Sequence, residues 1–496
     1  MVIPHPPTDA EKLSYLRTNR LPFYALGIFS FVVLIAGVWL FTLAHPYFFW
    51  FSLFAATLTF YLAVSYLIGV FGKDFDYEHH LDVLSTHKHY TPAVDVYLPA
   101  CGEPLEILRN TYTHIAALDY PNLSVHVLDD GASDELKELA KSFNFNYIRR
   151  PNRGELKKAG NLRYAFTQTS ADLILILDAD FCPRPDFLKE TVPHFAEDDK
   201  IAIVQTPQYF SLHPDQTWVE KGAGYIQELF YRMVQVNRDT FGGAICVGTC
   251  AVYRRTALEP FGGTAPIGYS EDVHTGFNVV SAGWKIKYLP LPLSKGVCPD
   301  EQKSFFIQQY RWSMGSITLF LNKEFWRSSL TPMQKICYAS GMLYYMTTGI
   351  AVFLQFLPST LLVWLTPELV LWYNVAFSLP SILFGTVFYS NWSYHPFGLY
   401  APKVKVLGYH AHFFAFIDKL RDRAVAWVPS GAVTKKISRF DNAKSALLYW
   451  TTLTHYALVA GVAYRAHDYP LYNFIPVLIL STYNYWLNMS VLKDQT

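Results

Sequence analysis

Two carboxylates, one residue apart, follow an unbroken apolar run in the middle of the chain. Asp178 and Asp180 come directly after 173–177, which the run predicts to be a buried strand. If the strand continues through them, residues i and i+2 share a face, so both carboxylates point at one ligand. Their oxygens suit Mg²⁺ or Mn²⁺, with phosphate oxygens and water completing the shell. A solvated turn at the strand end is the alternative interpretation.

A second acidic pair, Asp129 and Asp130, closes the apolar run 123–128 and precedes Gly131. Carboxylates at this position can accept hydrogen bonds from a ribose or from a uracil N–H. An Asp-Gly turn without a ligand is the alternative. Ligands of open α/β sheets bind beyond the carboxyl ends of the strands, so two acidic strand ends favour a ligand site.

A third acidic group, Ser270, Glu271 and Asp272, stands before a helical stretch. Capping of that helix by Ser270 would explain the serine without any chemistry. A carboxylate here can also act as the base that removes the proton of an attacking hydroxyl.

Gln308, Arg311 and Trp312 have the spacing that places side chains on one face of a helix. A guanidinium can clamp a phosphate with two parallel hydrogen bonds, and an indole can stack on the apolar face of a sugar ring. The group therefore suits a diphosphate beside a sugar. A surface helix with a buried tryptophan is the alternative.

Strands and helices alternate around these residues. Short apolar runs predict strands, and periodic runs between them predict helices at 103–118, from 133 onward and at 158–169. The predicted strands are 94–98, 123–128, 147–148, 173–177 and 201–204. Alternation with short links predicts a parallel α/β sheet. No GxGxxG and no Walker lysine loop occurs in the sequence, which disfavours a dinucleotide site or a P-loop ATPase.

The composition places this sheet in a membrane protein. Of 496 residues, 51% are hydrophobic and only 16% are charged, against about 25% charged in soluble domains. The net charge of +1 gives no field that would recruit nucleic acid, so no nucleic-acid partner is expected. Since a crossing helix needs about 20 apolar residues, the apolar stretches predict about six crossings, in three pairs.

The predicted division of the chain follows from these stretches. We expect an N-terminal tail at 1–20, two membrane helices in 21–72, a catalytic domain at 73–335, two helices in 336–390, a connection at 391–444, and two helices with a short tail in 445–496. Lys and Arg concentrate in the tail and in the connection. The positive-inside rule therefore predicts that both termini and the catalytic domain are cytosolic. The plasma membrane is the expected location, with the Golgi as alternative.

In order and spacing, D-D-G, D-x-D, S-E-D and Q-x-x-R-W resemble glycosyltransferase family two, and more closely its processive cellulose synthase-like and hyaluronan synthase-like branch. The resemblance covers 95–312. It implies a GT-A (Rossmann-like) α/β domain inserted in a multi-pass helical membrane domain. It also implies a UDP-sugar donor, Mg²⁺ or Mn²⁺, and inversion at the anomeric carbon.

The resemblance also implies roles for residues. Uridine would be held by Asp129 and Asp130, and the metal by Asp178 and Asp180. Lys158 would contact the diphosphate, Asp272 beside Glu271 would be the base, and Trp312 would form the acceptor site. Further contacts to donor or acceptor would come from Glu103, Gln308, Arg311, Val247, Gly248 and Thr249.

Some positions depart from the family pattern. The usual Tyr-Asn-Glu-Pro is Cys101-Gly102-Glu103-Pro104, so the aromatic residue that would face uracil is missing. A gating segment is partly matched by Val433, Thr434 and Lys436. The S-E-D group places the chain nearer to glucan synthases than to hyaluronan synthases.

The membrane side adds two expectations. An amphipathic helix at the membrane interface is predicted over 407–427, with an ordinary cytosolic helix as alternative, and 304–320 is a second candidate. A growing chain could pass from Trp312 between the membrane helices, along residues such as Tyr344, Tyr345, Trp450 and Tyr456. Ordinary packing of each aromatic side chain is the alternative.

The sequence thus predicts an inverting, processive synthase that polymerises a β-linked glucan and passes it across the bilayer. UDP-glucose is the first choice of donor. The alternatives are a non-processive enzyme that transfers one sugar to a lipid, and a chitin- or hyaluronan-type synthase using UDP-N-acetylglucosamine. The expected partners are the UDP-sugar, the growing polysaccharide and the lipid bilayer.

Overall fold

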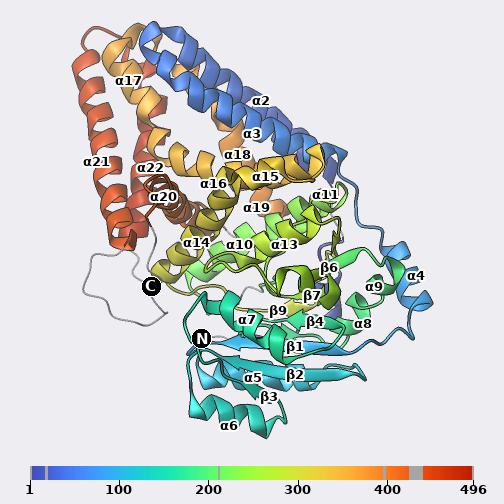
Figure 1. The fold of residues 1–496 in the computed structure, drawn as a ribbon. Helices are drawn as coiled ribbons and strands as arrows, with labels where there is room; N and C mark the ends of the chain where they lie inside the picture. The colour runs from blue at the N-terminus through green and yellow to red at the C-terminus, as the bar shows by residue number, and fades with distance from the viewer. Residues whose placement is uncertain (1–2, 17–19, 211–212, 395–397, 424–438, 494–496) are drawn as a thin grey trace.

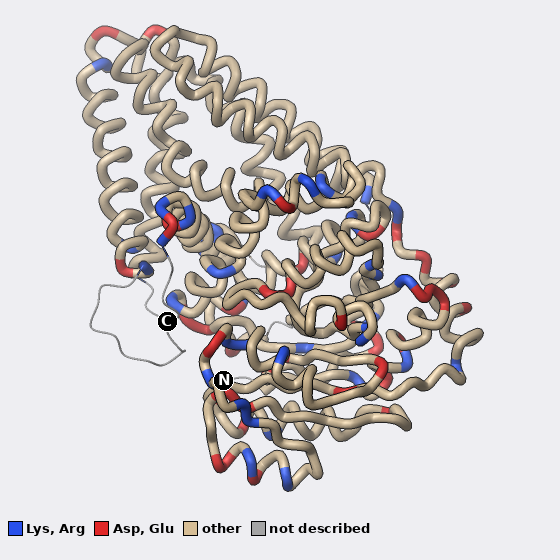
Figure 2. Tube along the Cα trace, viewed as in Figure 1, with Lys and Arg blue, Asp and Glu red and all other residues tan. Residues whose placement is uncertain are grey.

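The computed structural model describes residues 3–16, 20–210, 213–394, 398–423 and 439–493. A sheet flanked by helices forms one part, and long helices gather in the other (Figure 1). Figure 2 shows Lys, Arg, Asp and Glu spread over the sheet part, while the long helices are almost free of them. The charge distribution therefore separates an aqueous part from an apolar part, as the composition predicts.

A seven-stranded sheet carries the site, in the order β3-β2-β1-β4-β7-β6-β8. Its strands are β1 (Val94–Ala100), β2 (Leu123–Asp129), β3 (Asn146–Ile148), β4 (Leu173–Ile176), β6 (Ile201–Gln205), β7 (Ala251–Arg254) and β8 (Lys285–Tyr288). The five predicted strands are all present. The expectation of a parallel sheet is wrong at one strand, because β7 runs antiparallel to both β4 and β6.

Alternate side chains of β1 enter two different cores. Val94, Val96 and Leu98 pack with α5 (Leu105–Ala116) and α6 (Asp134–Ser142), whereas Tyr97 packs with α7 (Lys157–Gln168) on the other face. Asp95, on the same face as Tyr97, is also buried and is paired with His126 and Arg255, so both faces of β1 are covered. Each fully buried Val or Leu contributes about 1.5–3 kcal/mol, so these two cores hold the strand ends in place.

The segment before the first long helix is docked on the sheet part. Thr8 caps α1 (Asp9–Lys12) through a reciprocal capping box with Glu11. Lys12 then pairs with Glu190 at 2.6 Å and with Asp186 at 2.9 Å. The predicted tail at 1–20 is therefore fastened to the catalytic part wherever the structure describes it.

Four helical stretches are long and apolar enough to cross a membrane among the described residues: Arg20–Ala44, Pro46–Phe71, Pro332–Leu365 and Arg439–Arg465. The first two are the predicted pair in 21–72. The other predicted pairs each supply one such stretch. Their second members are the short pieces α18 (Leu379–Leu383) and α19 (Tyr389–Trp392), and α22 (Ile475–Lys493), which contains Ser, Thr and Asn. The count of six crossings stays a prediction.

The predicted interface helix at 407–427 corresponds to α20 (Tyr400–Leu420), which begins earlier and ends earlier. It packs against α10 (Trp218–Leu229), α14 (Gln302–Leu321) and α16 (Pro332–Leu354). A position at the membrane surface stays a prediction for this helix. The gating-like residues Val433, Thr434 and Lys436 lie outside the described residues.

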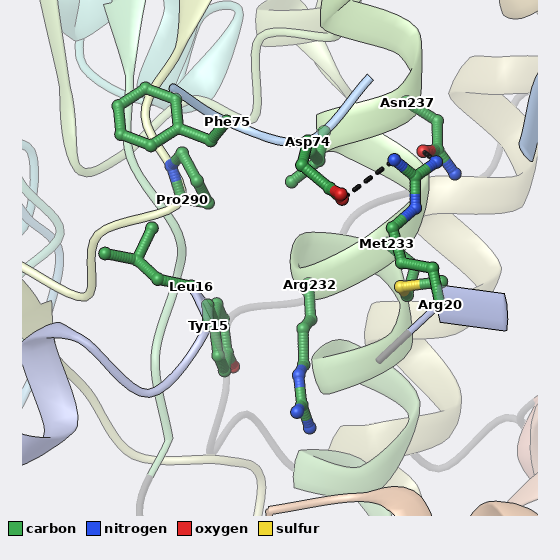
Figure 3. A pocket seen from close by; sticks show the side chains of 10 residues that line it. Tyr15, Leu16, Arg20, Asp74, Phe75, Arg232, Met233, Asn237 and Pro290 are labelled. Atoms are coloured by element: carbon green, nitrogen blue, oxygen red, sulfur yellow. Dashed lines mark hydrogen bonds and ion pairs between the residues drawn. The ribbon is translucent and has the colours of Figure 1, made fainter. Parts of the chain in front are cut away.

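Hydrogen bonds of Arg20 connect the sheet part to the first two long helices, α2 (Arg20–Ala44) and α3 (Ser52–Phe71). Arg20 donates to Asp74 at 2.8 Å, to the carbonyl of Gly69 at 2.8 Å and to Asn237 of α11 (Gln235–Asp239). Figure 3 shows Arg20, Asp74 and Asn237 converging beside a pocket of about 20 Å³, which is room for about one water. These contacts fix α11 against both helices.

Candidate active site

The carboxyl ends of β1, β2 and β4 meet at one edge of the sheet, because the three strands are parallel. Ala100 pairs with Asp129, and the backbone N–H of Leu177 bonds to the carbonyl of Tyr97. The two predicted acidic groups thus lie on neighbouring strand ends, as expected from the sequence.

Asp129 is fully buried, and nearby groups of the sheet part fill the hydrogen-bonding capacity of its carboxylate. One carboxylate oxygen accepts from the N–H groups of Gly131 and Ala132, and the other accepts from the N–H of Ser133 and the hydroxyl of Tyr147. A carboxylate has about four lone-pair positions, and all are used here. Asp129 therefore shapes the turn into α6, and a direct contact from it to uridine stays a prediction.

Asp130 is held in a bidentate ion pair that sequence reasoning missed. Arg150, which is 1% exposed, donates to its two oxygens at 2.7 and 2.8 Å. Arg150 also donates to the carbonyls of Glu155 and Lys157. The pair thereby connects the Asp-Asp-Gly turn to the start of α7, where Lys158 lies.

Asp178 and Asp180 lie beyond the strand. Because β4 ends at Ile176 and Asp180 is in a turn, the strand alternation used to place both carboxylates on one face does not apply. The turn nevertheless brings them together: burial and the charge of Asp178 raise the pKa of Asp180 to about 7, and Glu103 adds to this effect. Burial likewise raises the pKa of Glu103, with Asp178 contributing.

Lys158 is the cation inside this acidic group. It is bonded to Asp178 and donates to the carbonyl of Gly248 at 2.9 Å. Burial opposes its charge, but Asp178, Glu271 and Asp272 outweigh burial and raise its pKa. Lys158 therefore stands between the D-x-D turn and the S-E-D group, where a bound diphosphate would also lie.

The loop of Val247, Gly248 and Thr249 forms the floor between these groups. The hydroxyl of Thr249 accepts from the backbone N–H of Asp178 at 2.8 Å. The fully buried Gln205 side chain accepts from the N–H of Val247 and donates to the carbonyl of Thr249. At Gly248, φ is +77° and a Cβ would lie 2.9 Å from Asp272, so only glycine fits without strain.

A close helix contact places the S-E-D group against Q-x-x-R-W. Ser270 precedes α13 (Glu271–Ser281) but makes no capping hydrogen bond; its hydroxyl donates to the carbonyl of Arg311 in α14 at 3.2 Å. The capping interpretation is therefore wrong. Gly315, one turn along α14, leaves the space that the Ser270 side chain occupies.

Asp272 has the electrostatics expected of a general base. Burial, then the neighbouring charge of Glu271, raises its pKa to about 7. A base with a pKa near the working pH transfers protons efficiently. Its side chain faces a cavity that Trp312 also lines.

The Q-x-x-R-W side chains divide between two directions. Trp312 lines the cavity, whereas Gln308 and Arg311 do not. No hydrogen bond or ion pair of the Arg311 side chain occurs within the described part of the chain, and the buried Oε1 of Gln308 is likewise unpaired there. Both groups have hydrogen-bonding capacity for a ligand.

The cavity has a volume of about 420 Å³ and extends from Asp272 and Trp312 to the long helices. Tyr61 of α3 and Tyr344 and Tyr345 of α16 are among its lining residues. Tyr344 and Tyr345 are two of the four aromatic residues suggested for a path, and a path along them stays a prediction. Trp450 instead donates to the carbonyl of Phe353, and Tyr456 is exposed.

Residues 95–262 match the family Glycosyl transferase family 2, so the chain carries a glycosyltransferase domain of that family. The chain is 37% identical over 258 residues to Cellulose synthase 1 of Komagataeibacter xylinus, and the match covers 51% of this chain and 16% of that protein. It is 35% identical over 271 residues to the UDP-forming cellulose synthase catalytic subunit of Pseudomonas fluorescens (strain SBW25), covering 53% of this chain and 36% of that one. The chain thus spans only part of the length of these relatives.

A solved structure supports the fold class. The mannosyltransferase from Pyrobaculum calidifontis, in complex with GDP-Man and Mn²⁺, aligns with a TM-score of 0.52 at 16% identity, over 74% of this chain and 99% of that chain. The sheet and its helices are therefore a GT-A-like glycosyltransferase fold.

Proposed function

We propose that the protein is an inverting, processive glycosyltransferase that polymerises a β-linked glucan from a UDP-sugar, with UDP-glucose as first choice, and passes the product across the membrane. The similarity to UDP-forming cellulose synthase catalytic subunits supports the donor class. The family 2 domain supports the reaction class.

The donor would bind at the acidic edge of the sheet. Asp178 and Asp180 would hold Mg²⁺ or Mn²⁺, and this ion would stabilise charge on the leaving diphosphate. The residues fit such an ion, because burial, and then the neighbouring carboxylates of Asp178 and Glu103, raise the pKa of Asp180, and a bound cation would stabilise its ionised form. The described residues hold no cluster of three or more protein ligands, so phosphate oxygens and water would complete the shell. Lys158 and Arg311 would bind the remaining phosphate oxygens.

Asp272 would accept the proton of the acceptor hydroxyl while that oxygen attacks the anomeric carbon of the donor. The new glycosidic bond forms as the bond to UDP breaks, the proton stays on Asp272, and UDP leaves with the electron pair. Attack opposite the leaving group inverts the anomeric carbon. Trp312 would stack on the terminal sugar of the acceptor and hold its hydroxyl at Asp272.

The observation that carries the processive assignment is the cavity. It joins the proposed base, Asp272, to tyrosines of α3 and α16, two helices within stretches long enough to span a membrane. A product extended at Trp312 would therefore enter the helical part of the protein. Both termini and the catalytic part would face the cytosol.

The test is UDP release by the purified protein in lipid nanodiscs, across a panel of UDP-sugars with Mg²⁺ or Mn²⁺. Release should depend on one sugar and be lost in Asp272→Asn, which lowers the basicity of the side chain at equal size. A preference for UDP-N-acetylglucosamine would favour the chitin- or hyaluronan-type alternative. Equal release by Asp272→Asn would contradict the assigned base.

A further inference from the structure

A buried arginine in the cavity has no partner for most of its donors. Arg238 of α11 is 4% exposed and is among the lining residues of the cavity. Its Nη2 donates to the hydroxyl of Ser340 at 3.0 Å, but Nε and Nη1 have no hydrogen-bond partner within the described part of the chain. A guanidinium presents its donors as a planar fork, which suits two oxygens of one anion.

The charge of Arg238 is also uncompensated. It forms no ion pair with any described residue, and the titratable groups that act on it most strongly are Cys337, Tyr61, Tyr338 and Tyr345, none of them a carboxyl. Burying a charge without a counter-charge costs several kcal/mol. The site therefore has the chemistry of an anion site, and its ligand would come into the cavity.

The surroundings hold the guanidinium in a fixed position. A Cβ on Gly341 would lie 2.9 Å from Nη2, so α16 packs directly on Arg238. On the other side, Asn237 is bonded to Arg20 and to Tyr24 of α2. A fixed donor fork in a fixed wall favours one binding geometry, which reduces the entropy lost on binding.

The walls around Arg238 indicate what carries the anion. Leu62 and Ile68 of α3 and Phe384 line the same cavity. Because α3 lies in a candidate membrane span, the apolar part of a ligand held there would be in contact with a bilayer-facing helix. The volume of about 420 Å³ is typical of a site for a single small ligand and so suits a short acceptor, with its far end at Asp272.

We propose that Arg238 binds the phosphate group of an amphiphilic acceptor, so that synthesis starts on a sugar linked to a lipid phosphate. The inference rests on the proposed function, because the acceptor is extended at Asp272. It names the class of the first acceptor and assigns Arg238 as a binding residue for it.

The test compares two acceptors that differ by one group: dodecyl β-D-glucosyl phosphate and dodecyl β-D-glucoside. Transfer from UDP-glucose is measured in phosphatidylcholine nanodiscs. The wild type should have a KM at least about tenfold lower for the phosphate, since removing one partner of a buried charge pair leaves the other charge uncompensated. Arg238→Gln should abolish this difference and leave kcat with the glucoside unchanged. Equal KM values in the wild type would overturn the proposal.

Two controls show whether a lost acceptor preference reflects phosphate binding at Arg238 or damage to the enzyme. UDP-glucose hydrolysis without acceptor should be equal in wild type and Arg238→Gln; no transfer from UDP-glucose to either acceptor by the wild type would instead contradict the proposed function. If Arg238→Gln does not fold, the proposal is tested by inhibiting transfer in the wild type. Dodecyl phosphate should inhibit transfer more strongly than dodecanol, and equal inhibition by the two would overturn the proposal. If inorganic phosphate inhibits as strongly as dodecyl phosphate, the site binds free phosphate and the acceptor assignment is overturned. If the acceptor preference is lost in phosphatidylglycerol nanodiscs, the site binds a membrane phospholipid, and the assignment is likewise overturned.

Discussion

Asp272 is the residue on which the proposed chemistry depends, because it combines a raised pKa with a position on the cavity wall. The same group contains a cation, Lys158, which is bonded to Asp178. A base with a near-neutral pKa and a fixed cation for the leaving group are the two parts that a displacement by a hydroxyl requires.

Asp272→Asn should reduce transfer by about 10²–10⁴-fold, which is the usual contribution of a positioned general base. UDP binding should remain, because the proposed donor contacts lie at Asp178, Asp180 and Lys158. UDP release and UDP affinity, measured on the same preparation, separate the two effects. Turnover within a few fold of the wild type would exclude Asp272 as the base.

The pH dependence follows from the direction of the shift. Only the carboxylate form of Asp272 accepts a proton, so kcat/KM should fall as the pH drops below about 7 and level off above it. Saturating Mg²⁺ bound at Asp178 and Asp180, as proposed, would keep Asp180 ionised and leave Asp272 as the titrating group. A rate that does not change between about pH 5.5 and 8.5 would contradict this assignment, since a base with an ordinary Asp pKa of about 3.9 stays ionised throughout.

Arg311→Lys should lower transfer by at least about tenfold, because a point charge does not reproduce a planar fork on a diphosphate. The Arg311 side chain makes no ion pair within the described residues, so stability should change by less than about 0.5 kcal/mol. Transfer activity and thermal unfolding, measured on the same sample, test the expected loss of activity and the expected unchanged stability. Full activity in Arg311→Lys would show that Arg311 is not needed to bind the donor.

For single residues, the sequence predicts the motif residues but not the residues that hold them in place. Asp178, Asp180, Lys158 and Asp272 are recognisable because each belongs to a local pattern. Arg150, Gln205 and Arg238 are not, since their roles depend on contacts with residues distant in sequence. Asp129 is the opposite case: its pattern is conspicuous, yet its oxygens are used within its own loop.

At the scale of elements, the contact of α13 with α14 places the proposed base, Asp272, near Trp312. Ser270 bonds to the carbonyl of Arg311, and Gly315 gives it room. The strands are predictable from apolar runs, but the antiparallel direction of β7 is not, because strand direction depends on the path of the intervening α10 and α11. The position of Gly315 has no sequence signal of its own.

Gly315→Ala should impair transfer, because its Cβ would overlap Ser270 and push α13 from α14. Overpacking of this kind costs about 1–3 kcal/mol. The matched control is Gly268→Ala, whose Cβ would meet nothing within 4 Å. UDP release and unfolding temperature are measured for both. Equal activity of the two variants would show that the helix contact does not position the base.

For the whole molecule, the central feature is a cavity that connects Asp272 and Trp312 with the long helices. The sequence predicts a membrane protein, and within the described ranges four helical stretches meet the length and apolarity of a crossing. It does not predict the cavity, because this depends on how α3, α16 and α20 pack together. Tyr344 and Tyr345 are among the residues suggested for a path, and only the packing distinguishes them from Trp450.

Tyr345→Ala should shorten the product, because this ring lines the cavity beyond Trp312 and its loss removes a stacking surface for sugar. The initial rate of UDP release should change less than product length. Tyr456→Ala is the matched control, since Tyr456 is exposed and does not line the cavity. Product of unchanged length in Tyr345→Ala would exclude a path along this residue.

The most direct test is the size of the product made from radiolabelled UDP-glucose by the purified protein in nanodiscs. A processive glucan synthase should make a polymer of many sugars that an endo-β-glucanase degrades and that Asp272→Asn does not make. Label confined to a single sugar on lipid, with no polymer at any reaction time, would contradict a processive synthase and favour the non-processive alternative.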